Sequence, residues 1–284
     1  MPDQRPAQGT IRAGIGGWTF KPWEGTFYPG DLARSRQLHY ASRQLATIEV
    51  NGTFYRGQTP KTFAKWAAET PDGFRFSLKG HMAVTNRKAL AEAGGSIARF
   101  FATGVAELGD RLGPIVWQLQ PFKRFDADEI AAFLGLLPAA TGGIPLSHVL
   151  EVRHASFAVP AFVALARAHG VAIVHAHHEN YPEIADVTAD FVYSRLQRGK
   201  DSVPTAYPPD ELDGWAARAK VWAGGGVPRD LPLADPERAP DERARDVFIY
   251  FIHEGKVNAP QAAMALMQRT RQRTGQRTGQ RPGG

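Results

Sequence analysis

Short apolar runs rich in β-branched residues alternate along the chain with longer amphipathic segments. The runs predict strands at 11–16, 46–51, 74–79, 114–119, 147–153, 171–176, 190–196 and 246–252. The segments between them carry helix signals: Thr59-Pro60 begins one helix, and Asp126 with Glu129 forms a capping box at another. Further helices are predicted after Pro160 and Pro208, and over 31–43, 97–109 and 259–270.

Strands that are each followed by a helical segment predict a TIM-like (β/α)8 barrel. The alternative is a doubly wound open sheet, but Gly14, Gly16 and Gly17 do not form the G-x-G-x-x-G phosphate motif of that fold. No linker-like composition occurs before residue 268. We therefore expect one barrel domain over 11–268, a disordered N-terminus at 1–10 and a disordered basic tail at 269–284.

Within the predicted strands, polar residues alternate with apolar ones and share one face. The helix-facing side of a barrel strand is apolar, so the polar side is expected to point into the barrel. In barrel enzymes the C-terminal ends of the strands form the catalytic mouth. The polar residues expected to converge there are Glu49, Asn51, Lys79, Gln118, Glu151, Arg153 and Arg195.

This set holds two carboxylates and three cations, and its net charge of +1 suits an anionic or strongly polar ligand. We expect catalytic roles for Glu49, as a general base, and for Lys79 and Glu151. The residues expected to bind the substrate are Trp18, Asn51, Tyr55, Gln118, Arg153, Tyr193 and Arg195. The alternative is a structural network whose charges neutralise one another.

The loop after the first predicted strand, 17–30, is rich in aromatic residues. It holds Trp18, Phe20, Trp23, Phe27 and Tyr28. Such a loop can fold over the mouth as a lid or as a stacking platform for a base or sugar ring. The alternative, a small satellite core under the loop, explains the composition equally well.

Three histidines and a glutamate end the sixth predicted strand, in the run His175-Ala176-His177-His178-Glu179. Such clusters occur in metal sites, but on a strand only His175 and His177 share a face, and the chain has no H-E-x-x-H motif. We therefore predict no cofactor and no bound metal. A divalent metal held by His175 and His177 is the alternative.

Composition narrows the function classes. The chain has 284 residues and no cysteine, which excludes disulfides, thiolate zinc sites and a cysteine nucleophile. No apolar run approaches the ~20 residues that span a bilayer, and the N-terminal residues lack the apolar core of a signal peptide. We therefore expect a cytoplasmic protein with no membrane partner.

The distribution of charge along the chain suggests two main hypotheses about the function. The net charge of +6 comes mostly from 269–284, which carries five Arg and leaves 29 basic against 28 acidic residues elsewhere. The first hypothesis is an enzyme, with hydrolysis favoured, or a binder that takes a small anionic ligand, phosphate-bearing or nucleotide-like, into the barrel mouth. The alternative is a non-catalytic nucleic-acid-binding protein that uses the aromatic loop and the Arg-rich tail. No motif specifies the substrate or the oligomeric state.

Several short motifs occur together along the chain. They are Gly16-Gly17-Trp18, Trp23-x-Gly25-x-Phe27-Tyr28-Pro29, Glu49-x-Asn51-x-x-Phe54-Tyr55-Arg56, Glu151-Val152-Arg153-His154 and Tyr193-x-Arg195. With them the chain resembles the YecE-like family, domain of unknown function 72, over about residues 11–268. The resemblance implies a TIM-like barrel but no activity. The chain departs from the family at 197–199 and 251–255, where ligand contacts are expected to differ.

Overall fold

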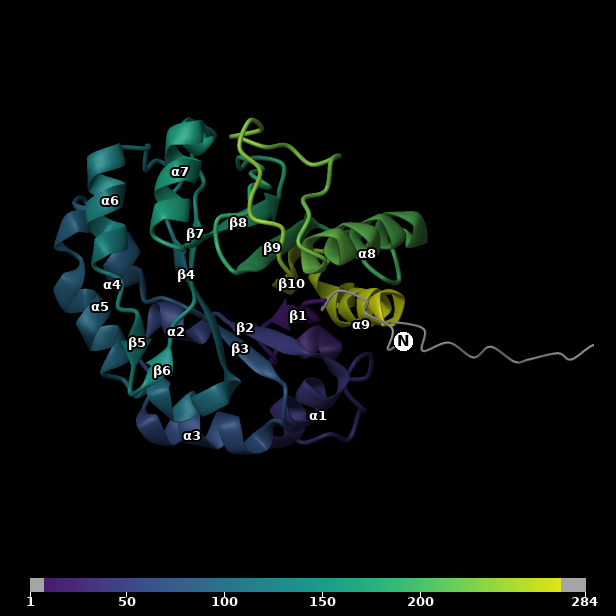
Figure 1. Cartoon of the computed structure of the whole chain (residues 1–284). Coiled ribbons are helices and arrows are strands. Elements are labelled where there is room, and N and C mark those ends of the chain that lie inside the picture. The colour runs from purple at the N-terminus through teal and green to yellow at the C-terminus, as the bar shows by residue number, and fades with distance from the viewer. Residues whose placement is uncertain (1–7, 272–284) are drawn as a thin grey trace, which may run out of the picture.

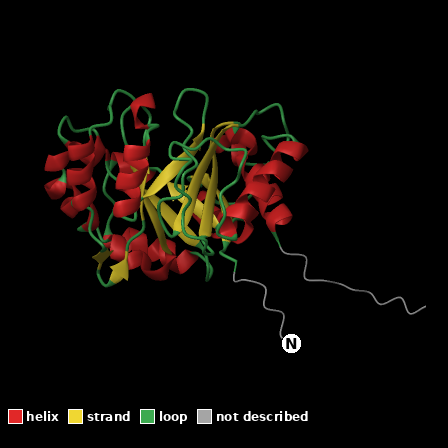
Figure 2. Ribbon diagram, turned by 45° about the horizontal axis from the view of Figure 1, so that its top comes forward, coloured by secondary structure: helices red, strands yellow, loops and turns green. Residues whose placement is uncertain are grey.

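The computed structural model describes residues 8–271. Eight parallel strands close into a barrel in the order β1-β10-β9-β8-β7-β4-β3-β2, surrounded by helices (Figures 1 and 2). The strands are β1 (Ile11–Gly16), β2 (Thr47–Val50), β3 (Arg75–Lys79), β4 (Leu112–Gln118), β7 (His148–Glu151), β8 (Ala172–His177), β9 (Phe191–Arg198) and β10 (Asp246–Glu254). The predicted TIM-like barrel is confirmed.

The helices on the outside of the barrel follow the strands in chain order. They are α1 (Gln37–Gln44), α2 (Gly52–Tyr55), α3 (Pro60–Glu69), α4 (Met82–Thr85), α5 (Gly94–Phe101), α6 (Ala127–Gly135), α7 (Pro160–Ala168), α8 (Pro209–Ala223) and α9 (Ala259–Thr270). A small antiparallel pair, β5 (Ala140–Thr141) and β6 (Ile144–Pro145), lies between α6 and β7. None of the helices in residues 8–271 is long and apolar enough to cross a membrane.

Helix ends follow the capping signals of the sequence. The Thr59 hydroxyl accepts a hydrogen bond from the Thr62 amide at 3.2 Å, and the Asp126 carboxylate accepts one from the Glu129 amide at 2.9 Å. The helix predicted over 97–109 is interrupted, because Gly104 takes a φ of 96°. Beyond that glycine the chain continues as a separate 3-10 helix, Val105–Arg111.

Apolar side chains form two clusters, one on each face of the barrel wall. The outer cluster joins the strands to the helices and includes Ile48, Phe76, Trp117, Leu150 and Ile249. The inner cluster fills the barrel and includes Val116, Val149, Val174, Tyr193 and Tyr250. Successive strand residues thus alternate between the two clusters, and polar residues at the inner positions lie inside the barrel.

The placed chain extends slightly beyond the predicted domain limits. The Gly9 amide donates to the carbonyl of Ala223, and the Thr10 amide donates to the Asp246 carboxylate at 2.8 Å. Arg269 and Thr270 belong to α9. The remainder of the predicted disordered segments, 1–7 and 272–284, lies outside the described residues.

Candidate functional site

Charged side chains meet at the C-terminal ends of three barrel strands. The Arg195 guanidinium of β9 lies between two carboxylates: its Nη2 donates to Glu49 Oε1 of β2 at 3.0 Å, and its Nη1 donates to Glu151 Oε2 of β7 at 2.6 Å. Both carboxylates are fully buried. Ala176 neighbours Arg195 in the register of β8 and β9, and its short side chain leaves space for the guanidinium. The three residues form a clamp across the barrel.

Arg153 continues the network towards the rim of the mouth. Its Nη2 donates to Glu151 Oε1 at 3.0 Å and to Gln118 Oε1 at 2.7 Å. Gln118 and Glu151 are side by side because they pair in the register of β4 and β7. The Arg153 guanidinium also lies 4.6 Å from the centre of the Tyr181 ring. Arg153 is therefore held in place from two sides.

Two buried hydroxyl groups extend the hydrogen-bond network of the clamp. The Tyr193 hydroxyl donates to Glu49 Oε2 at 2.6 Å and lies 2.8 Å from the Ser77 hydroxyl. Burial and the nearby Glu49 carboxylate raise the pKa of Tyr193, so this group stays a hydrogen-bond donor. Both oxygens of Glu49 therefore have charge-stabilising donors.

Burial alone would raise the pKa of Glu151, but the cations Arg195, Arg153 and Lys79 outweigh burial and hold this pKa below its ordinary value. The same clamp acts on Arg195. Burial alone would lower its pKa, and the two carboxylates raise it. Glu151 and Arg195 thus stabilise each other in their charged forms.

Lys79 brings a third cation to the mouth, from the end of β3. Its side chain is buried, and its Nζ lies 4.3 Å from the centre of the Phe54 ring. Among residues 8–271, Nζ forms no hydrogen bond and no ion pair. Burial, and then repulsion from Arg195, lower the pKa of Lys79 to about 8. The Lys79 amine therefore titrates close to neutral pH.

Backbone packing after β3 fixes the position of Lys79. The Thr53 hydroxyl donates to the Lys79 carbonyl at 2.7 Å, and the Gly80 amide donates to the Val116 carbonyl at 2.9 Å. A Cβ atom at Gly80 would lie 2.3 Å from the Trp117 ring, so only glycine fits there. The end of β3 is therefore held tightly against β4.

Three predicted binding residues lie outside this network. Asn51 is half-buried at the start of α2, and its Nδ2 would lie 3.1 Å from a Cβ atom at Gly16. Trp18 packs in the outer layer, its ring centre 5.1 Å from that of Trp66. Tyr55 is 68% exposed. Of the predicted site residues at the mouth, Glu49, Gln118, Glu151, Arg153, Tyr193 and Arg195 are hydrogen bonded together, with Lys79 beside them.

A family model, described as "Protein of unknown function DUF72", matches residues 12–283. The chain belongs to the DUF72 family. This finding agrees with the resemblance drawn from the sequence motifs, and the family description names no activity.

Individual relatives of this DUF72 protein agree with the assignment. The UPF0759 protein YunF of Bacillus subtilis is 27% identical over 158 residues, which is 54% of this chain and 54% of YunF. The chain therefore aligns with about half the length of that curated relative. A crystal structure of a DUF72 family protein from Thermotoga maritima matches 91% of this chain and 97% of its own, with a TM-score of 0.66 at 20% identity. One from Enterococcus faecalis matches 92% of this chain and 95% of its own, with a TM-score of 0.67 at 15% identity. At these identities the two structures show the fold alone.

His175 and His177 of the DUF72 barrel face the outer layer of helices, away from the mouth. His175 Nδ1 lies 2.9 Å from the Ser194 hydroxyl, and its Nε2 lies 2.9 Å from Glu183 Oε1. The His177 ring packs 4.9 Å from that of Trp215 on α8. Burial lowers the pKa of His177 to about 4. Residues 8–271 contain no group of three or more His, Cys, Asp or Glu side chains placed to hold a metal.

The aromatic loop of the DUF72 chain does not form a separate satellite core, because its buried rings belong to the outer apolar cluster. Trp23, Phe27 and Tyr28 are buried, and the Trp23 indole donates to the Lys256 carbonyl at 2.9 Å. The Tyr28 hydroxyl donates to the Trp18 carbonyl at 2.6 Å. The faces of these three rings are therefore used within the protein, and the interpretation of the loop as a stacking platform fails for them.

Sequence reasoning missed three aromatic side chains at the mouth. The His178 ring stacks on Tyr181 at 3.9 Å, and His253 meets His178 edge to face at 5.6 Å. His253 has a φ of 72°, a strained value for a residue that carries a Cβ atom. From the sequence, His178 is considered only as part of the histidine run. Tyr181 gave no periodic signal, because it lies in a loop.

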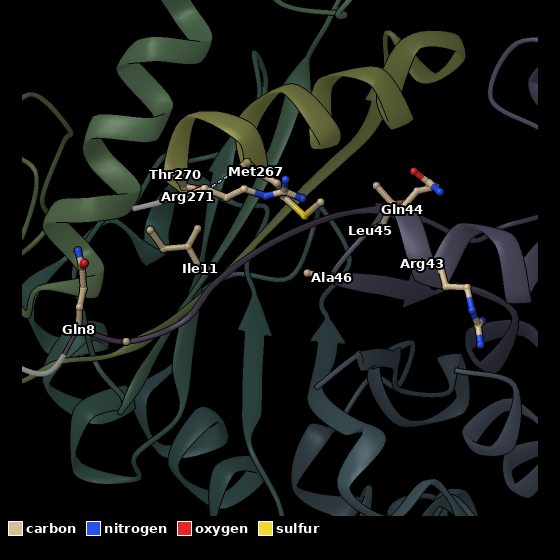
Figure 3. A pocket seen from close by; sticks show the side chains of 10 residues that line it. Gln8, Ile11, Arg43, Gln44, Leu45, Ala46, Met267, Thr270 and Arg271 are labelled. Carbon is tan, nitrogen blue, oxygen red and sulfur yellow. Dashed lines mark hydrogen bonds between the residues drawn. The ribbon is translucent and has the colours of Figure 1, made fainter. Parts of the chain in front are cut away.

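A cavity of about 380 Å³ opens at the opposite end of the DUF72 barrel (Figure 3). Its lining includes Ile11 at the start of β1, Ala46 just before β2 and Met267 near the end of α9. The charged side chains among its described lining residues are Arg43 and Arg271. This cavity shares no residue with the clamp and is not part of the candidate site.

Proposed function

We propose that the mouth of this barrel binds a small anionic ligand and that the protein is an enzyme acting on it. The proposal is supported by one observation: three cations at the mouth keep a donor that no residue of 8–271 occupies. They are Lys79 through Nζ, Arg153 through Nη1 and Arg195 through its buried Nε. Of these donors only Arg195 Nε is fully buried, and a buried donor without an acceptor is costly. Lys79 Nζ and Arg153 Nη1 can donate to a ligand oxygen.

The charges at the mouth point to an anion. Glu49 and Glu151 balance Arg153 and Arg195, and each carboxylate oxygen accepts a hydrogen bond from this set or from Tyr193. Lys79 adds a positive charge that no described carboxylate pairs at hydrogen-bond distance. Burying the Lys79 ammonium group away from water is costly, and a bound anion offsets this cost. The attraction between the two charges is also stronger in the barrel mouth than in water.

The arrangement changes the roles expected for the acidic residues. Glu49 is held by Arg195 and Tyr193, so the structure favours Glu49 and Glu151 as positioning residues for Arg195 and Arg153. Lys79, with a pKa of about 8, is the group best suited to exchange a proton near neutral pH. The proposed catalytic residue is therefore Lys79, and Arg153 and Arg195 are the proposed anion-binding residues.

Calorimetric titration tests the anion site directly. Inorganic phosphate, nucleoside monophosphates and sugar phosphates serve as probes, and the uncharged nucleosides and sugars serve as controls. Arg153→Ala is expected to weaken the binding of the charged probes about tenfold or more, because it removes one charge-assisted contact. Arg124→Ala, which removes an exposed arginine from the loop after β4, is the matched control and is expected to bind normally. Equal affinity in both variants, each shown to be folded, contradicts the proposal.

The pH dependence gives a second readout of the same site. Sulfate keeps its charge across the neutral range, so any change in its affinity reports on the protein. Lys79 is protonated below its pKa of about 8 and neutral above it. Sulfate affinity is therefore expected to fall as the pH rises through about 8, and to lose this step in Lys79→Met.

One observation favours a second candidate, a nucleic-acid-binding surface. Tyr55 and Phe122 are 68% and 78% exposed, and they follow β2 and β4 next to Arg56 and Lys123. Exposed rings beside cations are typical of single-stranded nucleic-acid binding. Fluorescence anisotropy with a labelled single-stranded RNA tests this candidate: the double variant Tyr55→Ala/Phe122→Ala is expected to abolish binding, and a chain truncated after Arg271 reports the contribution of the tail.

A further inference from the structure

We propose that the Lys79 amine forms an imine with the aldehyde or ketone carbonyl of a small anionic ligand. This inference rests on the proposed anion site and names the substrate class of that site: carbonyl compounds that also carry a carboxylate or phosphate. The observations behind it are the free Nζ atom of Lys79, its enclosure and the cations on the neighbouring strands.

The position of Lys79 leaves its amine available to a ligand. The side chain is 8% exposed, and its backbone is held by Thr53 and by the close contact of Gly80 with Trp117. Nζ contacts the face of the Phe54 ring and has no hydrogen-bond partner in residues 8–271. An amine that is fixed at its base can attack a ligand without first breaking a hydrogen bond or an ion pair.

Burial and charge together favour the neutral, nucleophilic form of the Lys79 amine. Burial and repulsion from Arg195 lower the pKa of its amine to about 8, so about a tenth of the amine is neutral at pH 7 and about half at pH 8. Lys65 and Lys123, in contrast, lie within salt-bridge distance of Glu69 and Glu129, so their amines have protein partners. Burial also lowers the pKa of Lys256, but no guanidinium contributes there.

Arg153 and Arg195 orient the anionic ligand relative to Lys79. Arg153 Nη1 has no acceptor in residues 8–271 and is free to donate to the carboxylate or phosphate of the ligand, and Arg195 adds a second positive charge beside it. Lys79 and Arg195 are close enough for their charges to repel. We expect an anionic group bound at Arg153, beside Arg195, to direct a carbonyl on the adjacent carbon towards Nζ.

The chemistry balances without an oxidant or a reductant. The Nζ lone pair attacks the carbonyl carbon, and the electron pair of the C=O π bond moves to oxygen, which takes up a proton as nitrogen loses one. The resulting carbinolamine loses its hydroxyl group as water, and the nitrogen lone pair forms the C=N bond. The net change is one amine plus one carbonyl giving one imine plus one water.

Reductive trapping of the full chain with glyoxylate tests this inference. Glyoxylate carries a carboxylate next to an aldehyde, and sodium cyanoborohydride reduces an imine to a stable secondary amine. At pH 8 the expected product is a mass increase of one carboxymethyl group per chain, located at Lys79 by peptide mapping. Lys79→Arg keeps the positive charge and cannot form the imine, so it is expected to lose the adduct, whereas Lys256→Met is expected to retain it.

Arg153→Ala separates the two proposals. With glyoxylate, this variant is expected to slow adduct formation about tenfold, the loss for one charge-assisted contact, and with the neutral acetaldehyde it is expected to change nothing. Calorimetric binding of glyoxylate that depends on Arg153, without any adduct at Lys79, overturns the imine and leaves the anion site standing. An adduct at Lys79 that forms equally fast in Arg153→Ala overturns the anion site and leaves the imine standing. Labelling spread over the exposed lysines, and unchanged in Lys79→Arg, overturns the inference.

Discussion

Each carboxylate oxygen of the buried Glu49 accepts a hydrogen bond, one from Tyr193 and one from Arg195. A buried carboxylate without such donors would cost several kcal/mol or take up a proton. At the scale of the residue, the stability of the site thus depends on a hydrogen-bond partner for each buried polar atom. Within the clamp, the exception is the buried Nε of Arg195, which has no hydrogen-bond partner in residues 8–271.

Tyr193→Phe tests the contribution of one such donor. The variant leaves Glu49 Oε2 without its partner, and the free energy of unfolding is expected to fall by about 2 kcal/mol. Tyr250→Phe is the matched control: it removes a bond of 2.7 Å between two neutral hydroxyls, Tyr250 and Thr47, and is expected to cost about 1 kcal/mol. Urea denaturation measures both. Equal losses would show that the charge of Glu49 does not matter.

The strained backbone of His253 gives a second prediction. Its φ of 72° favours glycine, and its side chain is exposed. His253→Gly is expected to raise the free energy of unfolding by about 1 kcal/mol, whereas His253→Ala removes the same side-chain contacts and keeps the strain. A thermal melt in which both variants behave alike would assign the effect to the imidazole and not to the backbone.

Alternation along the strands was enough to predict which polar residues point into the barrel. It identified Glu49, Glu151 and Arg195 because each lies opposite apolar neighbours that face the helices. Alternation could not predict the pairing, since Arg195 meets Glu49 and Glu151 only through the order and stagger of β2, β7 and β9. Nor could it place Trp18, which follows the turn at Gly17, where φ is 72°.

At the scale of elements, the sequence signals predicted the longer helices and missed α2 and α4, which are only four residues long. The short pair β5 and β6 was also missed, although Gly142 and Gly143, with φ of 54° and 80°, form the turn between them. Two glycines in succession favour such a hairpin turn. Its strands are only two residues long, too short for a recognisable alternation.

Removing one cap tests the element scale. Asp126→Ala deletes the acceptor for the Glu129 amide at the start of α6 and is expected to lower the free energy of unfolding by about 1 kcal/mol. Asp126→Ser keeps a side-chain acceptor and is expected to recover most of the loss. Guanidinium denaturation compares the two, and a serine variant as unstable as the alanine variant would argue against capping.

At the scale of the molecule, the clamp makes stability depend on pH. The pKa of Glu151 is lowered in the folded protein from its ordinary value of 4.5. The unfolded chain therefore binds more protons below about pH 4.5, and the stabilisation that is fully present above this value is lost as the pH falls through the folded pKa. The clamp is thus one of the groups whose protonation favours acid unfolding.

Glu151→Gln isolates this contribution. The difference in free energy of unfolding between wild type and variant is expected to be largest at neutral pH and to shrink below about pH 4.5. Glu237→Gln, at an exposed position before β10, is the control and is expected to show no such change. Chemical denaturation at a series of pH values measures the difference, and a constant gap would exclude linkage through Glu151.

The clamp also bears on the order in which the chain folds. Glu49, Glu151 and Arg195 come from the second, fifth and seventh strands of the barrel in chain order, so their contacts form only after most of the polypeptide has been gathered. Interactions absent from the transition state slow unfolding without speeding folding. The three side chains that shape the mouth are therefore expected to form their contacts late in folding. They are expected to slow unfolding and so to lengthen the lifetime of the native state.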